Sequence, residues 1–233
     1  MKKIIKIVLD LLFPPSETLR ELESLSSGEI FARCAKWEKN FPQCGNGPRL
    51  NLKSILKYKD PLVKEMLWQI KFRGQRKYAE ICGEFLYKRI IEEISSGGPG
   101  ACLGARSGTR SNNMPRRILI PVPIHQKRRK ERGFNQCEWL CEKIMELDAG
   151  RFLQYEPNLI HRVIYKQKQS WSDKKERIKN LEGVFAVTDR RKIIKREIIV
   201  LDDVYTTGAT LNALGEIILQ CEPANIRYFT VAH

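Results

Sequence analysis

The chain has 233 residues, of which 42% are hydrophobic and 30% are charged, a composition that excludes a largely disordered protein. Lysine and arginine outnumber aspartate and glutamate by 42 to 27, so the formal net charge is +15. Such an excess favours a polyanionic partner, whether nucleic acid, an anionic membrane or a phosphorylated small molecule. The alternative that charge alone leaves open is an ordinary basic surface.

The N-terminal segment is predicted to be a short amphipathic helix. Its sequence, KKIIKIVLDLLFPP, is an apolar run that Lys6 and Asp10 interrupt and that Pro14 and Pro15 end. It falls short of the ~20 apolar residues that span a bilayer, and no small-residue cleavage site follows. We therefore expect no signal peptide and no membrane span. The seven cysteines include no CxxC pair, which favours the reducing cytoplasm over a disulfide scaffold.

The next elements are expected to divide the chain into a small N-terminal region, residues 1–50, and a main domain, residues 51–233. In the first region a polar stretch follows the helix, and a segment rich in Gly, Pro and Asn ends it. The main domain begins with a helical pattern from Leu52, in which Asp60 and Pro61 predict the start of one helix and a second runs to about residue 94.

The remainder of the chain begins with a segment, 95–117, that is dense in Gly, Ser and Asn and is expected to be a mobile surface insertion. Beyond it, strands alternate with helices. In chain order we expect a short buried strand in RILIPVPI (117–124) that ends at Pro121, basic loop 125–136, helix 137–147, strand 159–165, helix 172–181, strand 183–187, strand 196–203, helix 211–221 and strand 225–233. This alternation predicts an α/β fold with a largely parallel sheet flanked by helices.

The last strand–turn–helix unit carries a candidate ligand site, IIVLDDVYTTGAT (198–210). Asp202 and Asp203 end an apolar strand of the kind that opens at the ligand-binding edge of an α/β sheet. Carboxylates there accept hydrogen bonds from vicinal hydroxyls. The turn that follows supplies backbone N–H groups and hydroxyls for a phosphate, from Thr206, Thr207, Gly208, Ala209 and Thr210. Together these features describe a sugar phosphate. The structural alternative is that Asp ends a strand and Thr caps a helix.

A basic run, KRRKERG (127–133), is expected at the same edge of the sheet, because it follows a predicted strand. Arg128, Arg129 and Arg132 are candidates to bind the charges of a pyrophosphate. A solvated charged turn is the alternative, and KQKQS (166–170) is a second candidate for the same role. We expect Cys137, Cys141 and Trp139 to be packing residues.

Two of these motifs carry a family resemblance. IIVLDDVYTTGAT resembles the signature by which type I phosphoribosyltransferases bind 5-phosphoribosyl-1-pyrophosphate (PRPP), and PVPIHQKRRKERGFNQ (121–136) is similar to a segment of the ComF competence proteins, which share that fold. The likeness spans about residues 52–233. It implies that Asp202 and Asp203 hold the ribose hydroxyls, that the turn holds the 5′-phosphate, that Mg²⁺ accompanies PRPP, and that Arg132, Asn135 and Gln136 are contact residues.

The chain also departs from that family, whose members commonly begin with a cysteine zinc module. Here the matching region retains only Cys34 and Cys44, and the three histidines lie far from it in the sequence. A tetrahedral zinc site needs four ligands, so we predict no zinc and no protein-bound metal. The insertion at 95–117 is longer than the family usually has.

Three hypotheses for function follow. The first is a ComF-like, PRPP-binding protein that serves DNA uptake, with competence proteins as partners and with basic segments such as 174–179 and 190–196 contacting single-stranded DNA. The second is an active phosphoribosyltransferase, in which a nitrogen nucleophile displaces pyrophosphate from C1 of the ribose and Mg²⁺ neutralises the leaving group. The third is a PRPP-sensing regulator without turnover. Because the printed sequence ends directly after the last predicted strand, we expect any acceptor site to come from the N-terminal half.

Overall fold

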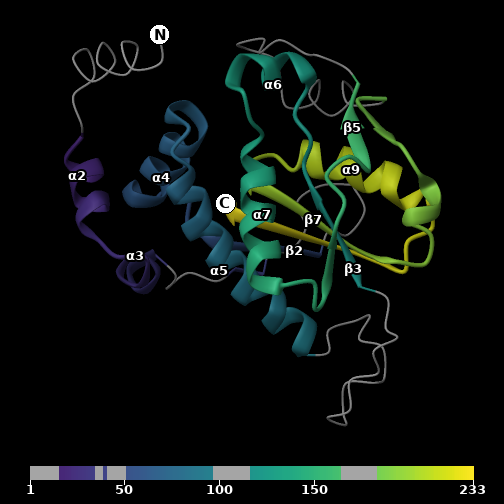
Figure 1. Ribbon diagram of the computed structural model, residues 1–233, viewed down its shortest axis with the longest axis horizontal. Coiled ribbons are helices and arrows are strands. Elements are labelled where there is room, and N and C mark those ends of the chain that lie inside the picture. Colours follow the sequence, from purple (N-terminus) through teal and green to yellow (C-terminus); the bar gives the residue numbers. More distant parts are fainter. Residues whose placement is uncertain (1–15, 35–38, 41–50, 97–115, 164–182) are drawn as a thin grey trace.

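The computed structural model describes residues 16–34, 39–40, 51–96, 116–163 and 183–233. Its centre is a six-stranded sheet in the order β1-β2-β8-β7-β3-β4 (Figure 1). The strands are β1 (Lys39–Asn40), β2 (Asn51–Leu56), β3 (Arg117–Pro121), β4 (Leu153–Tyr155), β7 (Glu197–Val204) and β8 (Asn225–Ala232). All neighbouring pairs are parallel except β1 with β2. The predicted α/β fold with a largely parallel sheet is confirmed.

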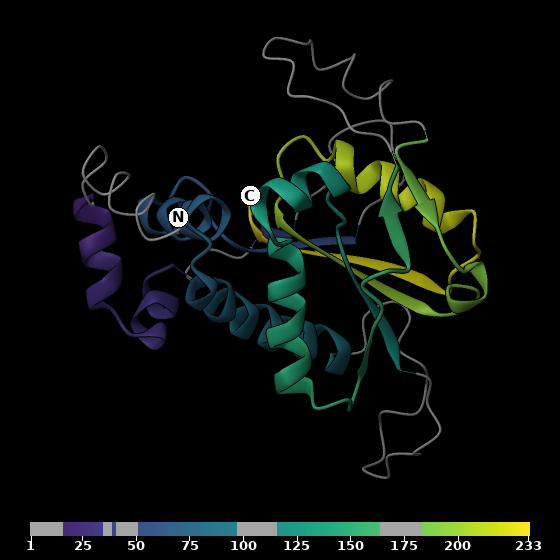
Figure 2. The same ribbon diagram turned by 45° about the horizontal axis from the view of Figure 1, so that its top comes forward.

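Helices cover both faces of this sheet. The long helices are α4 (Pro61–Arg73), α5 (Arg76–Ser95), α7 (Gln136–Asp148) and α9 (Ala209–Leu219). Figure 2 shows α5 and α7 on one side of the sheet and α9 on the other. Helix α5 packs closely on α7 at Gly83, where a Cβ atom would lie 2.8 Å from the Cβ of Lys143. This double cover explains why β3 and β7 read as nearly unbroken apolar runs.

The start of α4 is where the sequence placed it. The Asp60 carboxylate accepts hydrogen bonds from the backbone N–H groups of Leu62 and Val63, at 2.9 and 3.4 Å, and Pro61 is the first helical residue. The helix ends at Gly74, whose φ of 63° lies in the left-handed region.

Residues 51–56 correct the predicted helical pattern, because they form strand β2. The apolar side chains at Leu52, Ile55 and Leu56 have the three- and four-residue spacing of a helix, which misled the local prediction. In the fold this segment pairs in parallel with β8, with Ser54 opposite Thr230, and the two hydroxyls share a hydrogen bond. Strand β4 was also missed, since three residues carry too little periodicity.

The predicted polar stretch near the N-terminus is also corrected. It forms two helices, α2 (Glu17–Ser24) and α3 (Ser27–Cys34), and α2 packs beside α4. A capping box starts α3: the Ser26 N–H donates to the Glu29 carboxylate at 2.8 Å, and the Glu29 N–H donates to the Ser26 hydroxyl at 3.3 Å. The predicted helix at the very N-terminus and Cys44 lie outside the described residues.

The predicted basic loop 125–136 contains a short helix, α6 (Gln126–Arg132). Its first turn is capped by the His125 ring, whose Nδ1 accepts from the Lys127 N–H at 3.1 Å, and Gly133 ends it with a φ of 85°. The two short strands predicted further on are confirmed as β5 (Ile160–Arg162) and β6 (Phe185–Val187). They pair with each other in an antiparallel hairpin and lie outside the main sheet.

Three other predicted segments, the insertion within 97–115, the candidate loop 166–170 and the helix at 172–181, fall outside the described residues. In the part of the chain that the structure describes, no helix combines the length and the apolar character that crossing a membrane requires.

A half-buried ionic network lies at the end of the sheet where β7 and β8 begin. The Glu197 carboxylate pairs with Arg117 of β3, whose Nε atom lies 2.6 Å from Oε2. It also pairs with Arg227 of β8, whose Nε atom lies 2.8 Å from Oε1. This second contact is ionic, because its angle is not that of a hydrogen bond. The Arg227 guanidinium also donates to the backbone carbonyl of Glu93 at 3.0 Å. The network ties three strands to the end of α5.

Candidate functional site

The predicted acid pair lies at the carboxyl end of the central strand β7. Four apolar residues of this strand lie in the core. Asp202 and Asp203 follow them and are only 9% and 8% exposed. The Asp202 Oδ1 atom accepts the backbone N–H of Asp203 at 2.8 Å, and the Asp203 Oδ1 atom accepts the N–H of Val204 at 2.8 Å. The two carboxylates are thus held by their own strand.

Side chains distant in sequence complete the surroundings of Asp203. Its Oδ2 atom accepts a hydrogen bond from the Gln136 amide at 3.1 Å and lies 3.6 Å from the Lys71 ammonium. Gln136 is the first residue of α7, and Lys71 lies in the last turn of α4. Gln136 was expected as a contact without a known partner, and its partner is this acid.

The environment of Asp202 is less favourable to charge. Burial, and then the neighbouring charge of Asp203, raise the pKa of Asp202 from 3.8 to about 8. Asp203 has the amide and the ammonium beside it instead. Two adjacent carboxyl groups therefore sit in different surroundings, as is common where acids bind or process a ligand.

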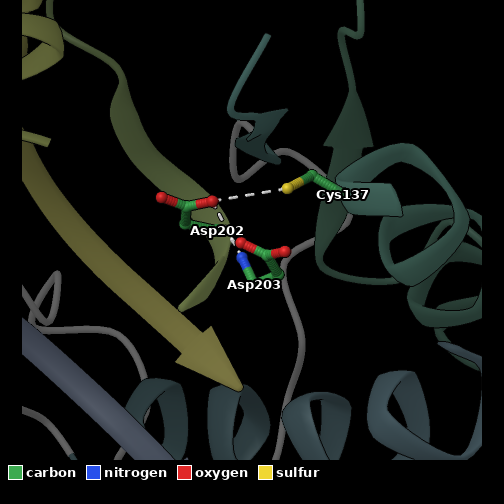
Figure 3. A group of neighbouring side chains, drawn as sticks. All are labelled: Cys137, Asp202 and Asp203. Carbon is green, nitrogen blue, oxygen red and sulfur yellow. Dashed lines mark hydrogen bonds between the residues drawn. The ribbon is translucent and has the colours of Figure 1, made fainter. Parts of the chain in front are cut away.

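Cys137 is part of this site, although the sequence analysis assigned it to packing. Its thiol donates to the Asp202 Oδ1 atom, with Sγ 3.5 Å from the oxygen (Figure 3). Burial, the first cause, and the two acids raise the pKa of this thiol well above 9.0. The sulfur and one oxygen of each acid lie within 4.8 Å of one another, so these three side chains could hold a metal ion. The sequence offered one signal that Cys137 belongs to the site: this residue lies in the first turn of a helix that follows a parallel strand.

The turn after the acids has the backbone that a phosphate site requires. Gly208 has a φ of 76°, and a Cβ atom there would lie 2.6 Å from the Tyr205 hydroxyl oxygen. Helix α9 begins at Ala209 without a side-chain cap, so its first N–H groups are left for another acceptor. Thr206 and Thr207 are exposed in the turn. Thr210 lies half-buried in the first turn of the helix.

The predicted arginines divide into two groups. Arg132 is half-buried and donates to the Gln136 Oε1 atom at 3.2 Å. Its pKa is lowered, first by burial and next by the positive charge of Arg128, while the negative charge of Asp203 acts in the opposite direction. Arg132 thus lies near the acids and Arg128 lies near Arg132, whereas Arg129 forms an ion pair with Glu138 on α7.

Sequence reasoning missed a third arginine, Arg162, on the β5–β6 hairpin. Its pKa is lowered by burial and then by the charge of Arg128, and the negative charge of Asp202 opposes that change. Arginines from α6 and the hairpin therefore border the acid pair. Nothing in the local sequence of 159–163 could have indicated where the hairpin would lie.

The remaining candidates have structural roles in the described chain. Asn135 caps α7 by accepting the Cys137 N–H at 3.1 Å, and its amide donates to the Val122 carbonyl at 3.1 Å. Trp139 is half-buried and stacks on Phe134 with ring centroids 3.9 Å apart. Cys141 is fully buried, as expected of a packing residue.

The fold and the site define an α/β protein with a buried acid pair, a phosphate-type turn and bordering arginines at one edge of its sheet. Its sequence is 30% identical to Competence protein ComFC of Bacillus subtilis over 182 residues, covering 77% of this chain and 62% of that protein. It is 25% identical to Competence protein F of Haemophilus influenzae over 230 residues, covering 89% of this chain and 92% of that protein. It is also 25% identical to DNA utilization protein YhgH of Escherichia coli O157:H7, with 85% and 86% covered.

The chain is therefore similar in sequence to competence proteins of the ComF type and to a DNA utilization protein. It spans less than two thirds of the length of the Bacillus relative. No protein-family model matches it. Among solved structures, a hypoxanthine phosphoribosyltransferase of Trypanosoma cruzi is 15% identical with a TM-score of 0.41, covering 66% of this chain and 64% of that one. A likeness at that level supports no conclusion about this chain.

Proposed function

We propose that the chain binds PRPP together with Mg²⁺ at the carboxyl end of β7. The observation that carries this proposal is the unbroken order of a buried acid pair, a turn closed by a left-handed glycine and an uncapped helix N-terminus. The acids accept hydrogen bonds from the neighbouring hydroxyls of the ribose. The N–H groups and hydroxyls from Thr206 to Thr210 bind the 5′-phosphate.

The pyrophosphate of PRPP is assigned to the arginines that border the acids. In the absence of an anion, the positive charge of Arg128 on α6 repels that of Arg132 on the same helix and that of Arg162 on β5. A pyrophosphate relieves this repulsion with charge-assisted hydrogen bonds. Arg129 would join only by exchanging its ion pair with Glu138.

Mg²⁺ would fit this site, because Asp202 and Asp203 offer hard oxygen donors. The carboxylate oxygens of Asp202 and Asp203 suit Mg²⁺, whereas the Cys137 sulfur does not. The ion would supply charge neutralisation for the pyrophosphate. The protein residues orient the ribose through the acids and hold the anionic groups at either end.

We further propose that the chain serves DNA uptake or use and contacts single-stranded DNA, with competence proteins as partners. The relatives are named competence proteins and a DNA utilization protein, and the net charge of +15 favours a polyanion. The proposed location is the cytoplasm, since the five cysteines among the described residues are free thiols.

Two other functions at the same site are distinguished by turnover. In an active phosphoribosyltransferase, a nitrogen nucleophile displaces pyrophosphate from C1 of the ribose, and the arginines stabilise the departing charge. A regulator would bind PRPP without this reaction. Pyrophosphate release measured across a panel of nucleobases separates them: release with any base favours the enzyme, and binding without release favours the regulator.

Calorimetry with PRPP and Mg²⁺ tests the proposal. The double variant Asp202→Asn/Asp203→Asn keeps the size of both side chains but replaces each carboxyl group with an amide. Since a hydrogen bond to a charged group contributes about 1.5–3 kcal/mol, we expect affinity to fall about 100-fold or more. Asp189→Asn is the matched control, because Asp189 caps the short helical turn at Arg190–Lys192, at a distance from the site in the sequence. Equal affinities for the double variant and the unaltered chain would contradict the ribose assignment.

A further inference from the structure

Helix α4, whose Lys71 contacts Asp203, exposes two large aromatic rings. Trp68 is 41% exposed and Phe72 is 60% exposed, although both are apolar side chains that normally bury most of their surface. They lie one helical turn apart, with ring centroids 5.8 Å from each other and planes inclined by 40°. Tyr58, just before the helix, is 41% exposed as well. No other aromatic ring among the large apolar side chains of the described residues is as exposed as these three.

An arginine guanidinium lies over each of the two α4 rings. The Arg73 guanidinium lies 5.3 Å from the centre of the Trp68 ring, and the Arg132 guanidinium lies 5.9 Å from the centre of the Phe72 ring. Cation–π contacts of this kind hold a positive charge and a flat surface side by side. Arg132 also donates to Gln136, so one edge of the aromatic surface belongs to the network around the acids.

Further positive charge follows the same face of the helix. Lys64 lies one turn before Trp68 and is exposed, and its ammonium forms no ion pair with any described residue. Lys71, between the two rings in sequence, contacts Asp203 at 3.6 Å. Aromatic rings and basic side chains therefore alternate from the exposed face of α4 to the acid pair.

The segment predicted to contact DNA, 190–196, differs from α4 in this respect. Three of its five cations are matched by nearby acids: Arg190 pairs with Glu222 at 3.2 Å, Arg191 with Asp189 at 3.0 Å, and Lys192 with Glu156 at 2.7 Å. These pairs cancel much of the charge that a phosphate backbone would need. The exposed face of α4 is therefore better suited than residues 190–196 to bind a nucleic acid.

We propose that the α4 aromatic surface, formed by Lys64, Trp68, Phe72, Arg73 and Arg132, binds single-stranded DNA by stacking its bases on the two rings. The proposal rests on the proposed contact with single-stranded DNA and assigns it a surface. Base–aromatic stacking works for every base, because every base has a flat face, and the flanking cations bind phosphates. A duplex hides those faces inside its own stack, so the surface selects single strands.

The test is fluorescence anisotropy with a labelled oligonucleotide and with an abasic strand of the same length and charge. In the double variant Trp68→Ala/Phe72→Ala we expect affinity for the intact strand to fall about tenfold or more for each ring removed. Affinity for the abasic strand stays the same, because the phosphate contacts remain. Trp68→Phe/Phe72→Tyr should restore binding of the intact strand. Leu219→Ala, which truncates another exposed apolar side chain on α9, should bind like the unaltered chain.

Three results would overturn the proposal: no binding of the intact strand at low salt, equal binding of intact and abasic strands by the unaltered chain, or full affinity in the double variant. A loss that affects intact and abasic strands alike would assign the rings to another role, such as contact with a protein. PRPP calorimetry on the unaltered chain is a separate measurement. Failure there removes the PRPP proposal and leaves the DNA result standing.

Discussion

Asp202→Asn should change the dependence of stability on pH. The pKa of this carboxyl is 3.8 in an unfolded chain and about 8 in the fold. Between those values the folded protein keeps a proton that the unfolded chain releases. The free energy of unfolding therefore falls as pH rises through this range, by at most about 1.4 kcal/mol for each pH unit. The whole interval sets an upper limit of about 6 kcal/mol.

The effect that we expect is smaller, on the order of 2–3 kcal/mol between pH 5 and pH 8, because Asp202 shares its site with a second acid. Asparagine cannot ionise, so the variant should lose this part of the slope and gain stability over the unaltered chain as pH rises. Urea denaturation at pH 5, 6, 7 and 8 measures the free energy of unfolding of both proteins. Asp189→Asn is the control, because the hydrogen bond from Arg191 lowers the pKa of that half-buried carboxyl. Parallel pH profiles for Asp202→Asn and the unaltered chain would refute the reasoning.

Three further substitutions test other parts of the structure by chemical denaturation. Gly208→Ala should cost about 1–3 kcal/mol, since the residue has a positive φ and a Cβ would meet a tyrosine hydroxyl at 2.6 Å; an unchanged midpoint would contradict the strained turn. Arg227→Met should cost about 3–5 kcal/mol, because Glu197, whose side chain is 13% exposed, loses one of its two cations, and a neutral result would mean that the pair is not needed. Asn135→Ala should cost about 1–2 kcal/mol through the lost helix cap and the lost bond to the Val122 carbonyl, whereas a stable variant would show that water replaces both.

The parts of the site that follow one another in sequence could be predicted. The run from Ile198 to Thr210 contains its own strand, turn and helix start, and each rests on local chemistry: apolar residues for a buried strand, Gly208 for the left-handed turn. The structure keeps that order and puts the acids at the end of β7. The start of α4 at Asp60 and Pro61 was also local, and it is confirmed.

The parts that depend on distant contacts could not be predicted. Lys71, Cys137 and Arg162 approach the acids only because three separate elements fold onto β7, and no local pattern encodes that approach. The helical prediction for the segment that forms strand β2 was also wrong because of a distant contact. Its spacing at 52, 55 and 56 suits a helix, and pairing with β8 overrides it.

The position of β7 determines the stage of folding at which the acid site is complete. This strand lies between β3 and β8, so its acids acquire their final setting only when β8, which follows β7 in the sequence, has been added beside it. A newly made chain that stops short of β8 would carry the whole motif and still lack the site. Any ligand held there is therefore a reporter of completed assembly, and its binding would protect the entire sheet against unfolding and proteolysis.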